Sequence, residues 1–362
     1  AWEQRKFGEM ANRRSEVSAS GNLPRVEYED IVSGTGTLNK DVFEKQSQKQ
    51  GIVFHSGDVL YGKLRPYLQN WLLASFNGLA VGDFWVLEPQ GLNSNYLYRI
   101  IQTKQFDEIA NQSVGTKMPR ADWKLVSKAT FLNPASFNEQ RLIGKFFKDI
   151  DSLLTLHQRK YEKLLNIKKS MLEKMFPKEG EVVPEIRFKG FTGAWEQRKI
   201  KDLAANTYGG GTPSTSNPDF WEGSIPWIQS SDLSEHNLFR VRPRKFISQA
   251  AVTNSPVKII PESSIAVITR VGVGKLAVMN FSYTTSQDFL SLSNLNTDVK
   301  FTSYQLYRRL QKDLNAVQGT SIKGITKEEL LGKNIFIPGR QEQEAIGKFF
   351  SKIDSLLTLH QR

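Results

Sequence analysis

The chain has 362 residues, 39% of them hydrophobic and none of them cysteine. This apolar content suffices for packed cores and excludes a disordered protein, while the lack of cysteine excludes disulfide frameworks and thiolate metal sites. The mean hydropathy of −0.42 argues against a membrane span, and the net charge of +12 favours polyanionic partners.

Two segments recur along the chain. Residues 1–6 read Ala-Trp-Glu-Gln-Arg-Lys and return as residues 194–199, while residues 139–159 return as residues 342–362 with four positions changed. Near-identity over so long a segment requires one explanation for both copies. The sequence therefore predicts two halves of one fold, with different surfaces between the repeats.

Each half carries mixed helix and strand signals. Short β-branched and aromatic runs bounded by Gly, Asp and Asn predict strands, and apolar spacing of three to four residues predicts helices. Strands are expected at residues 51–60, 80–87, 259–269 and 275–281, and helices at residues 95–111 and 303–317. The Asp-Phe pair at residues 83–84 aligns with the pair at residues 288–289. We predict an α/β (α+β) fold, with a small twisted sheet and flanking helices in each half.

The longer repeat carries a heptad seam. Steps of four and three residues place its members on one face of a helix. The seam comprises Ile143, Phe147, Ile150, Leu154 and His157 in the first copy, and Ile346, Phe350, Ile353, Leu357 and His360 in the second. We expect a long central helix within residues 137–178 that pairs with a C-terminal helix at residues 339–362. Two separate surface helices, each on its own globular core, are the alternative.

These features resemble the specificity subunit of Type I restriction-modification enzymes. The resemblance rests on the Ile-Gly-Lys-Phe-Phe-x-x-Ile-Asp-Ser-Leu-Leu-Thr-Leu-His-Gln-Arg helix in both copies, the Trp-Glu-Gln-Arg-Lys start of each half, and the segments 210–214 and 220–228. It implies two pseudo-symmetric target recognition domains, each reading half of a split DNA sequence, separated by long helices that form an antiparallel coiled coil. The domains are expected at residues 1–136 and, with a connector, 179–338. Because the second helix stops at Arg362, we expect a truncated chain.

The resemblance also implies partners. Two methyltransferase subunits, which bind S-adenosylmethionine, and restriction subunits, which use ATP and Mg, would assemble with this chain on double-stranded DNA. The chain itself would bind no cofactor and have no active site. Lysines outside the seam are candidate docking residues, although a solvated helix face is an equal alternative; they are Lys145, Lys148, Lys348 and Lys352. Since no signal peptide is recognisable, we expect a cytoplasmic protein.

Polar and basic loops beside glycines are the candidate DNA contacts. Arg or Lys after a strand is suited to guanine edges or phosphates, and aromatic residues interleaved with basic ones favour nucleic acid. The candidates in the first half are Tyr61, Lys63, Arg65, Gln112, Thr116, Lys117 and Arg120; those in the second half are Thr212, Arg270, Lys275, Gln318, Thr320, Ser321 and Lys323. For any single member, an ordinary exposed side chain is the alternative.

Catalytic patterns are missing from the sequence. The glycine-rich segments 209–214 and 272–275 lack the ending of a nucleotide-binding P-loop, and the four histidines do not form a metal or catalytic pattern. Neither a complete nuclease motif nor a segment that would hold a flipped adenine is recognisable. We therefore predict a non-catalytic DNA-reading subunit. The alternatives are a coiled-coil scaffold that does not read DNA, and a self-sufficient DNA methyltransferase or nuclease.

Overall fold

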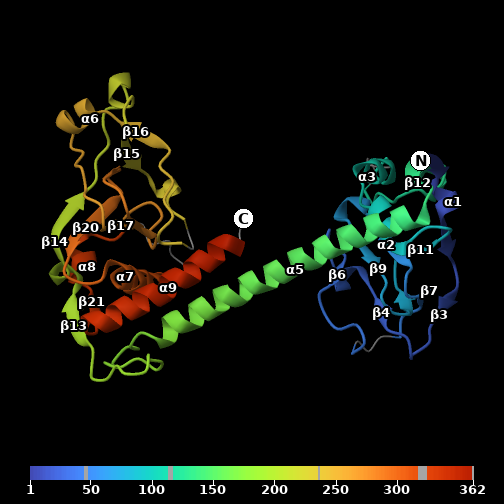
Figure 1. The fold of residues 1–362 in the computed structure, drawn as a ribbon, viewed down its shortest axis with the longest axis horizontal. Coiled ribbons are helices and arrows are strands. Elements are labelled where there is room, and N and C mark those ends of the chain that lie inside the picture. Colours follow the sequence, from blue (N-terminus) through green and yellow to red (C-terminus); the bar gives the residue numbers. More distant parts are fainter. Residues whose placement is uncertain (45–47, 113–116, 235–236, 317–323, 361–362) are drawn as a thin grey trace. The chain divides into compact units, whose positions relative to one another are not determined.

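The computed structural model describes residues 1–44, 48–112, 117–234, 237–316 and 324–360 (Figure 1). The chain divides into two units, residues 1–156 and 157–362, and helix α5 (Phe137–Lys174) belongs partly to each. Among the described residues, no helix combines the length and the apolar character needed to cross a bilayer.

The described residues of the first unit form two four-stranded sheets and two two-stranded ribbons. One sheet has the order β2 (Ala11–Arg14), β11 (Phe84–Pro89), β8 (Val59–Gly62), β9 (Trp71–Leu73), and the other β3 (Val17–Ser18), β7 (Gly51–Phe54), β10 (Gly78–Ala80), β4 (Arg25–Val26). β1 (Trp2–Lys6) pairs with β12 (Thr130–Pro134), and β5 (Ile31–Val32) with β6 (Thr37–Leu38). Short helices complete the unit: α1 (Phe7–Met10), α2 (Ser94–Ile100), α3 (Lys104–Ala110) and α4 (Trp123–Val126), with 3₁₀ turns η1 (Tyr28–Asp30) and η2 (Pro66–Leu68).

Three predicted elements of this unit are divided. The strand expected at residues 80–87 is the end of β10 and most of β11, with Gly82 (φ 105°) between them. The strand expected at residues 51–60 is β7 and β8, because the chain turns at Gly57, whose φ is 95°. The helix expected at residues 95–111 is α2 and α3, because Thr103 ends the first and caps the second by accepting a hydrogen bond from the Phe106 amide.

The second unit repeats this plan. Its main sheet has the order β14 (Ala204–Gly209), β20 (Phe289–Leu295), β17 (Ser264–Ile268), β18 (Leu276–Met279). A three-stranded sheet has the order β16 (Lys245–Ile247), β15 (Ile225–Ile228), β19 (Thr284–Thr285), and β13 (Glu196–Lys199) pairs with β21 (Asn334–Ile337). The helices are α6 (Gln249–Thr253), α7 (Val299–Ala316), α8 (Lys327–Gly332) and α9 (Arg340–His360), with 3₁₀ turns η3 (Ile200–Asp202), η4 (Pro218–Phe220) and η5 (Ser230–Asp232).

Strand register shows that the two units share one fold. Phe84 lies opposite Gly62 in the first unit, and Phe289 lies opposite Ile268 in the second. The residue after each strand donates its amide to the carbonyl of the aspartate that precedes this phenylalanine. Lys63 donates to Asp83 at 2.8 Å, and Thr269 donates to Asp288 at 2.7 Å. The prediction of a mixed fold with two related halves and a long helix is confirmed.

A glutamine joins each unit to its helix in the same way. In the first unit, Gln140 donates to the Pro134 carbonyl at 2.9 Å and accepts from the Asn93 amide at 3.2 Å. In the second, Gln343 donates to the Pro338 carbonyl at 2.8 Å and accepts from the Asp298 amide at 2.9 Å. We call these contacts the glutamine links. They attach the same turn of each repeat to the same positions of its unit.

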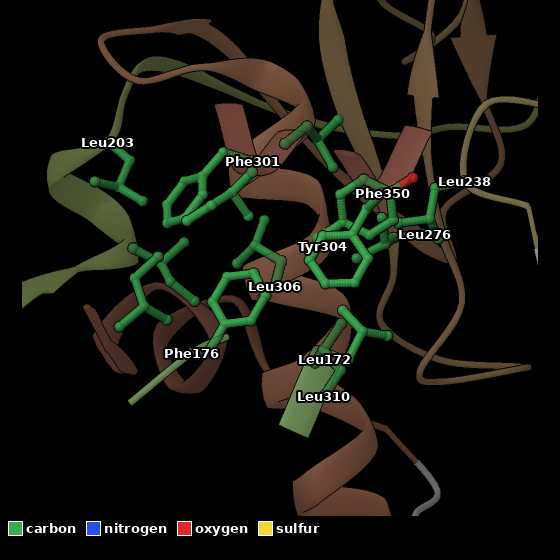
Figure 2. Packing of buried hydrophobic residues seen from close by; sticks show 14 of the residues in the cluster. Leu172, Phe176, Leu203, Leu238, Leu276, Phe301, Tyr304, Leu306, Leu310 and Phe350 are labelled. Carbon is green, nitrogen blue, oxygen red and sulfur yellow. The ribbon is translucent and has the colours of Figure 1, made fainter. Parts of the chain in front are cut away.

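The core of the second unit forms where α9 and the end of α5 pack on α7. Figure 2 shows Tyr304 beside Phe350, and their ring centroids are 5.0 Å apart. The ring centroid of Phe176 lies 5.9 Å from that of Phe350. Leu172 and Phe301 complete this group. Full burial of such side chains stabilises a fold by roughly 1.5–3 kcal/mol each.

The two copies of the heptad seam have different surroundings. Ile346, Phe350, Ile353 and Leu357 of α9 are all buried in this core. In the first copy, Ile143 packs partly against the core of the first unit, whereas Phe147, Ile150 and Leu154 are exposed. The cover over α9 comes from Leu172 near the end of α5 and from Met175 and Phe176 directly after it, all beyond the repeated segment.

The histidines of the seam meet, because His157 Nδ1 and His360 Nδ1 lie 3.0 Å apart. The pKa of His360 lies below its ordinary value of 6.5, because its imidazole is partly desolvated and because Lys160 and His157 disfavour a positive charge there. The folded state therefore disfavours the protonated form, and the unfolded chain binds more protons as the pH falls below about 6.5. The stability contributed by this contact is present above that pH and is lost in acid.

We accordingly expect the thermal midpoint of the second unit to fall between pH 6.5 and pH 5.5, because protonation places positive charge on His360 beside Lys160 and His157. The His360→Gln variant should have a flatter pH dependence over this range. Thermal unfolding of both proteins in matched buffers measures the difference. Equal slopes for parent and variant would contradict a role of this pair in acid sensitivity.

Candidate nucleic-acid interface

The loop that follows β8 carries the first group of predicted DNA contacts. Residues 62–70 turn back through η2 between two residues with left-handed backbone, Arg65 (φ 51°) and Gln69 (φ 54°). The Gly62 amide donates to the Asn70 carbonyl at 2.7 Å and closes the loop. The Arg65 side chain is exposed.

A second predicted loop lies beside the first. Leu64 forms a β-bridge with Arg120, the Arg65 amide donates to the Pro119 carbonyl at 2.8 Å, and the Ala121 amide donates to the Lys63 carbonyl at 2.8 Å. The structure thus brings together two segments that are more than fifty positions apart in the sequence, as the hypothesis of a shared surface requires.

Asp83 organises the cations of this surface. Its carboxylate lies 3.5 Å from Lys63 Nζ and 3.0 Å from Arg120 Nη2. Within the described part of the chain, no hydrogen bond or ion pair holds the guanidinium of Arg65. Arg65 is therefore more available to an incoming anion or base than Lys63 and Arg120, which pair with Asp83.

Tyr61 requires a correction, because it is not a surface residue. Its ring is buried, stacks on Trp85 at 5.6 Å and meets Phe106 edge-on at 5.2 Å. Burial raises the pKa of its phenol above the ordinary value. Tyr61 supports the strand before the loop and does not reach a ligand.

The second unit has the equivalent pair of segments. The loop 269–275 follows β17, and the Thr269 carbonyl accepts from the Ile325 amide at 2.7 Å, as Lys63 does from Ala121. Arg270 is exposed, and Lys275 is half-buried where the loop enters β18. Gln311 of α7 donates to the Gly274 carbonyl at 2.9 Å, which fixes the base of the loop.

Gly274 is required at that position for two reasons. Its φ is 97°, which L side chains rarely adopt. A Cβ there would also lie 2.2 Å from Leu314 Cδ1. Helix α7 therefore packs directly against the backbone of the loop.

The glycine-rich stretch 209–214 is packed more than the sequence suggests. A Cβ on Gly210 would lie 1.8 Å from the Ser286 carbonyl oxygen, and the buried Trp227 indole donates to the Gly211 carbonyl at 2.9 Å. Thr212 is half-buried, and its hydroxyl is bonded to the Gln287 side chain. The predicted DNA contact Thr212 thus already makes a hydrogen bond within its own unit.

The remaining predicted residues divide into two groups. Gln112 and Lys117 are exposed at the edges of the second loop. Thr116, Gln318, Thr320, Ser321 and Lys323 lie outside the described residues.

Sequence reasoning missed two features of the first unit. One is the pairing of Asp83 with two cations, and the other is Tyr67, an exposed aromatic residue at the tip of the first loop. Pro66 was the available signal for Tyr67, because proline after an exposed residue favours a turn that projects its neighbour. As to metals, no cluster of three or more His, Asp or Glu side chains suited to an ion occurs in the described ranges.

Comparison with known proteins identifies one protein family for both halves of the chain. The family model described as "Type I restriction modification DNA specificity domain" matches residues 1–166 and 193–362. The specificity subunit of the Type I restriction enzyme MjaIX from Methanocaldococcus jannaschii is 30% identical over 170 residues, which are 45% of this chain and 38% of that protein. A Type I specificity subunit from Escherichia coli is 32% identical over 187 residues, 49% of this chain and 42% of its own length. The matches thus span less than half of each relative.

Solved structures have the same fold. The S subunit of a Type I restriction-modification system from M. genitalium superimposes with a TM-score of 0.63 at 12% identity, covering 100% of this chain and 91% of that one. A chain from a structure of Type I restriction-modification complex assembly superimposes with a TM-score of 0.53 at 18% identity, covering 99% and 91%.

Proposed function

Because the chain belongs to the Type I restriction modification DNA specificity domain family, whose model matches both halves, we propose that it is a non-catalytic subunit that reads a split DNA sequence. Each unit reads one half-site. The net charge of +12 supports attraction to the duplex.

The repeated loop pair carries the proposal. In both units the loop after the corresponding central strand is bonded through the same backbone groups to a second segment, at 2.8 Å through Lys63 and 2.7 Å through Thr269. The side chains differ, because Leu64 in the first loop corresponds to Arg270 in the second. One scaffold with two sets of side chains is suited to two different half-sites on one duplex.

The proposal includes partner subunits. Two methyltransferase subunits, which would bind S-adenosylmethionine, dock on the repeated helices, and restriction subunits that use ATP and Mg complete the assembly. Two near-identical helical segments supply two near-identical seats. Lys145, Lys148, Lys348 and Lys352 support this assignment, because all four are exposed outside the seam. Lys145 also pairs with Asp149 at 2.6 Å.

Exchange of the first domain tests the split target. Replacing residues 7–136 with the equivalent domain of a relative should change one half of the methylated sequence and leave the other half intact. Genome-wide mapping of methylated adenines, in cells with the parent chain, the chimera or neither, measures this. Loss of both halves would contradict modular reading, and methylation that does not depend on the chain would favour a scaffold without DNA reading.

Arg65 and Lys63 should make different kinds of contact. Arg65→Ala should weaken binding of the cognate duplex by about 1–3 kcal/mol and relax specificity at one position, because a bidentate guanidinium reads guanine. Lys63→Ala should weaken all duplexes alike and reduce the salt slope by about one, because an ammonium contacts phosphate. We expect Arg270 in the second unit to behave like Arg65.

The measurement is binding of the assembled methyltransferase to cognate and single-mismatch duplexes at several salt concentrations. Lys104→Ala is a suitable control, because Lys104 is an exposed cation on α3 that pairs with Glu108 at 3.5 Å and belongs to neither of the two loops. If the Arg65, Lys63 and Arg270 variants all bind like the parent at every salt concentration, these loops face away from DNA.

A further inference from the structure

Tyr67 is held outward by a strained loop. Its side chain is 54% exposed at the tip of residues 62–70, between Arg65 and Gln69. Left-handed backbone is unfavourable for a residue other than glycine, because Cβ then crowds the carbonyl oxygen, and this loop contains two such residues. Strain of this kind persists only where the surrounding structure enforces it.

Three hydrogen bonds enforce the conformation. The Leu68 amide donates to the Arg65 carbonyl at 2.8 Å, and the Gly34 amide donates to the Gln69 carbonyl at 3.0 Å. The Ser33 hydroxyl also bonds to the Leu68 carbonyl. The loop is therefore fixed from the neighbouring β5–β6 hairpin, and Tyr67 projects from a rigid support.

Tyr67 has no internal role that explains this support. Among the described residues, its hydroxyl makes no hydrogen bond and its ring meets no other ring. Two other exposed aromatic residues are engaged, since Phe43 contacts Phe76 at 5.0 Å and the Trp2 indole bonds to Glu139. A rigid aromatic side chain loses little conformational entropy when it binds, and this suits it to a contact.

The second unit has an apolar residue at the matching tip. Because Lys63 corresponds to Thr269, the loop 269–275 takes the place of residues 63–70, and Val271 at its tip is 70% exposed. Arg270 precedes it and Gly272, with φ 93°, follows it. Both loops thus present an apolar tip beside an exposed arginine, although the residues differ.

We infer that Tyr67 and Val271 are base-contacting residues, one for each half-site. Tyr67 lays its ring against an apolar base edge in the major groove, such as the thymine methyl group, and Val271 packs on such an edge in the other half-site. The adjacent arginines supply the charge that brings the tips to the duplex. This inference rests on the proposed function and adds the specificity-determining side chains to it.

The test uses the full chain in its methyltransferase complex and three duplexes: the cognate sequence from methylation mapping, one with the first half-site altered, and one with the second altered. Tyr67→Ser should bind the cognate duplex about 5- to 100-fold more weakly than the parent, the range for loss of one base contact in a duplex. Tyr67→Phe should stay within about threefold, because the ring carries the contact. Val271→Ser should weaken binding through the other half-site.

Alteration of the half-site that Tyr67 reads should abolish the difference between parent and Tyr67→Ser. Leu132→Ser, which changes a similarly exposed side chain on β12, should bind like the parent, and thermal unfolding checks that every variant is folded. Parent-like cognate binding by Tyr67→Ser, an equal loss in Tyr67→Phe, or an equal loss on all three duplexes would each overturn the inference. Each of these results concerns the inference alone, provided that the parent complex still binds the cognate duplex more tightly than the altered duplexes. A parent complex that binds all three duplexes equally would overturn both the inference and the proposed function.

Discussion

Lys168→Met is expected to lower the free energy of unfolding of the second unit by about 3–5 kcal/mol, the usual loss when one partner of a buried ion pair is removed. Lys168 Nζ lies 2.5 Å from Asp354 Oδ1, and both side chains are buried. The Tyr304 hydroxyl donates to Asp354 Oδ2 at 2.6 Å. Methionine fills most of the lysine volume but removes the ammonium group that neutralises the buried carboxylate. Urea titration with linear extrapolation measures the loss.

The repeat supplies a matched control for this pair. Asp151 occupies the position of Asp354 in the first copy and pairs with Arg99, but its side chain is 47% exposed. Asp151→Asn should therefore change stability by less than about 1 kcal/mol, whereas Asp354→Asn should approach the loss in Lys168→Met. The double variant Lys168→Met/Asp354→Leu should recover most of the loss, because it buries no charge. Equal effects of the two Asp→Asn changes would contradict the assigned burial.

Ile353→Asp should destabilise the second unit by about 3–5 kcal/mol, because it places a carboxylate in an apolar core without a partner. Ile353 is 6% exposed and lies in the cluster with Phe176 and Phe350. Ile150 occupies the same position in the first copy and is 36% exposed. Ile150→Asp should therefore change the stability of the isolated chain by less than about 1 kcal/mol.

Thermal and urea unfolding of both isoleucine variants separate two descriptions of the repeat. A symmetric heptad pair predicts equal losses, since the two segments are nearly identical. The structure predicts unequal losses, because burial depends on residues outside the repeat. A large loss in both variants would indicate that the first seam is also covered in solution.

Much of the fold follows from pattern alone. The repeated segments predict two related units and the start of α5 at Phe137, and the alignment of the Asp-Phe pairs predicts the matching strands. The seam could not be placed in the same way. Its spacing identifies a buried face but not the side chains that bury it, and in the second unit these come from Leu172, Met175 and Phe176.

The candidate site was less predictable for a similar reason. Val59 and Tyr61 belong to one core of the first unit and Leu60 to another, so β8 is buried on both faces. Such a strand has no polar face to indicate which side chains reach solvent. The sequence therefore predicts Tyr61 at the surface, where it does not lie. The loop after Tyr61 is exposed at Arg65, as the sequence predicts. Tyr67 was missed because its exposure depends on the two left-handed residues beside it.

The glutamine links have a consequence for how new specificities arise. Gln140 and Gln343 bond to backbone carbonyls and amides, which every sequence supplies at those positions. Side chains elsewhere in a unit can therefore change completely without altering how that unit is rotated about its own helix. A transplanted unit that keeps the backbone at residues 93 and 134 should therefore have the same rotation about its helix as the original unit. An exchange of one unit for another should therefore keep the backbone on both sides of the glutamine link.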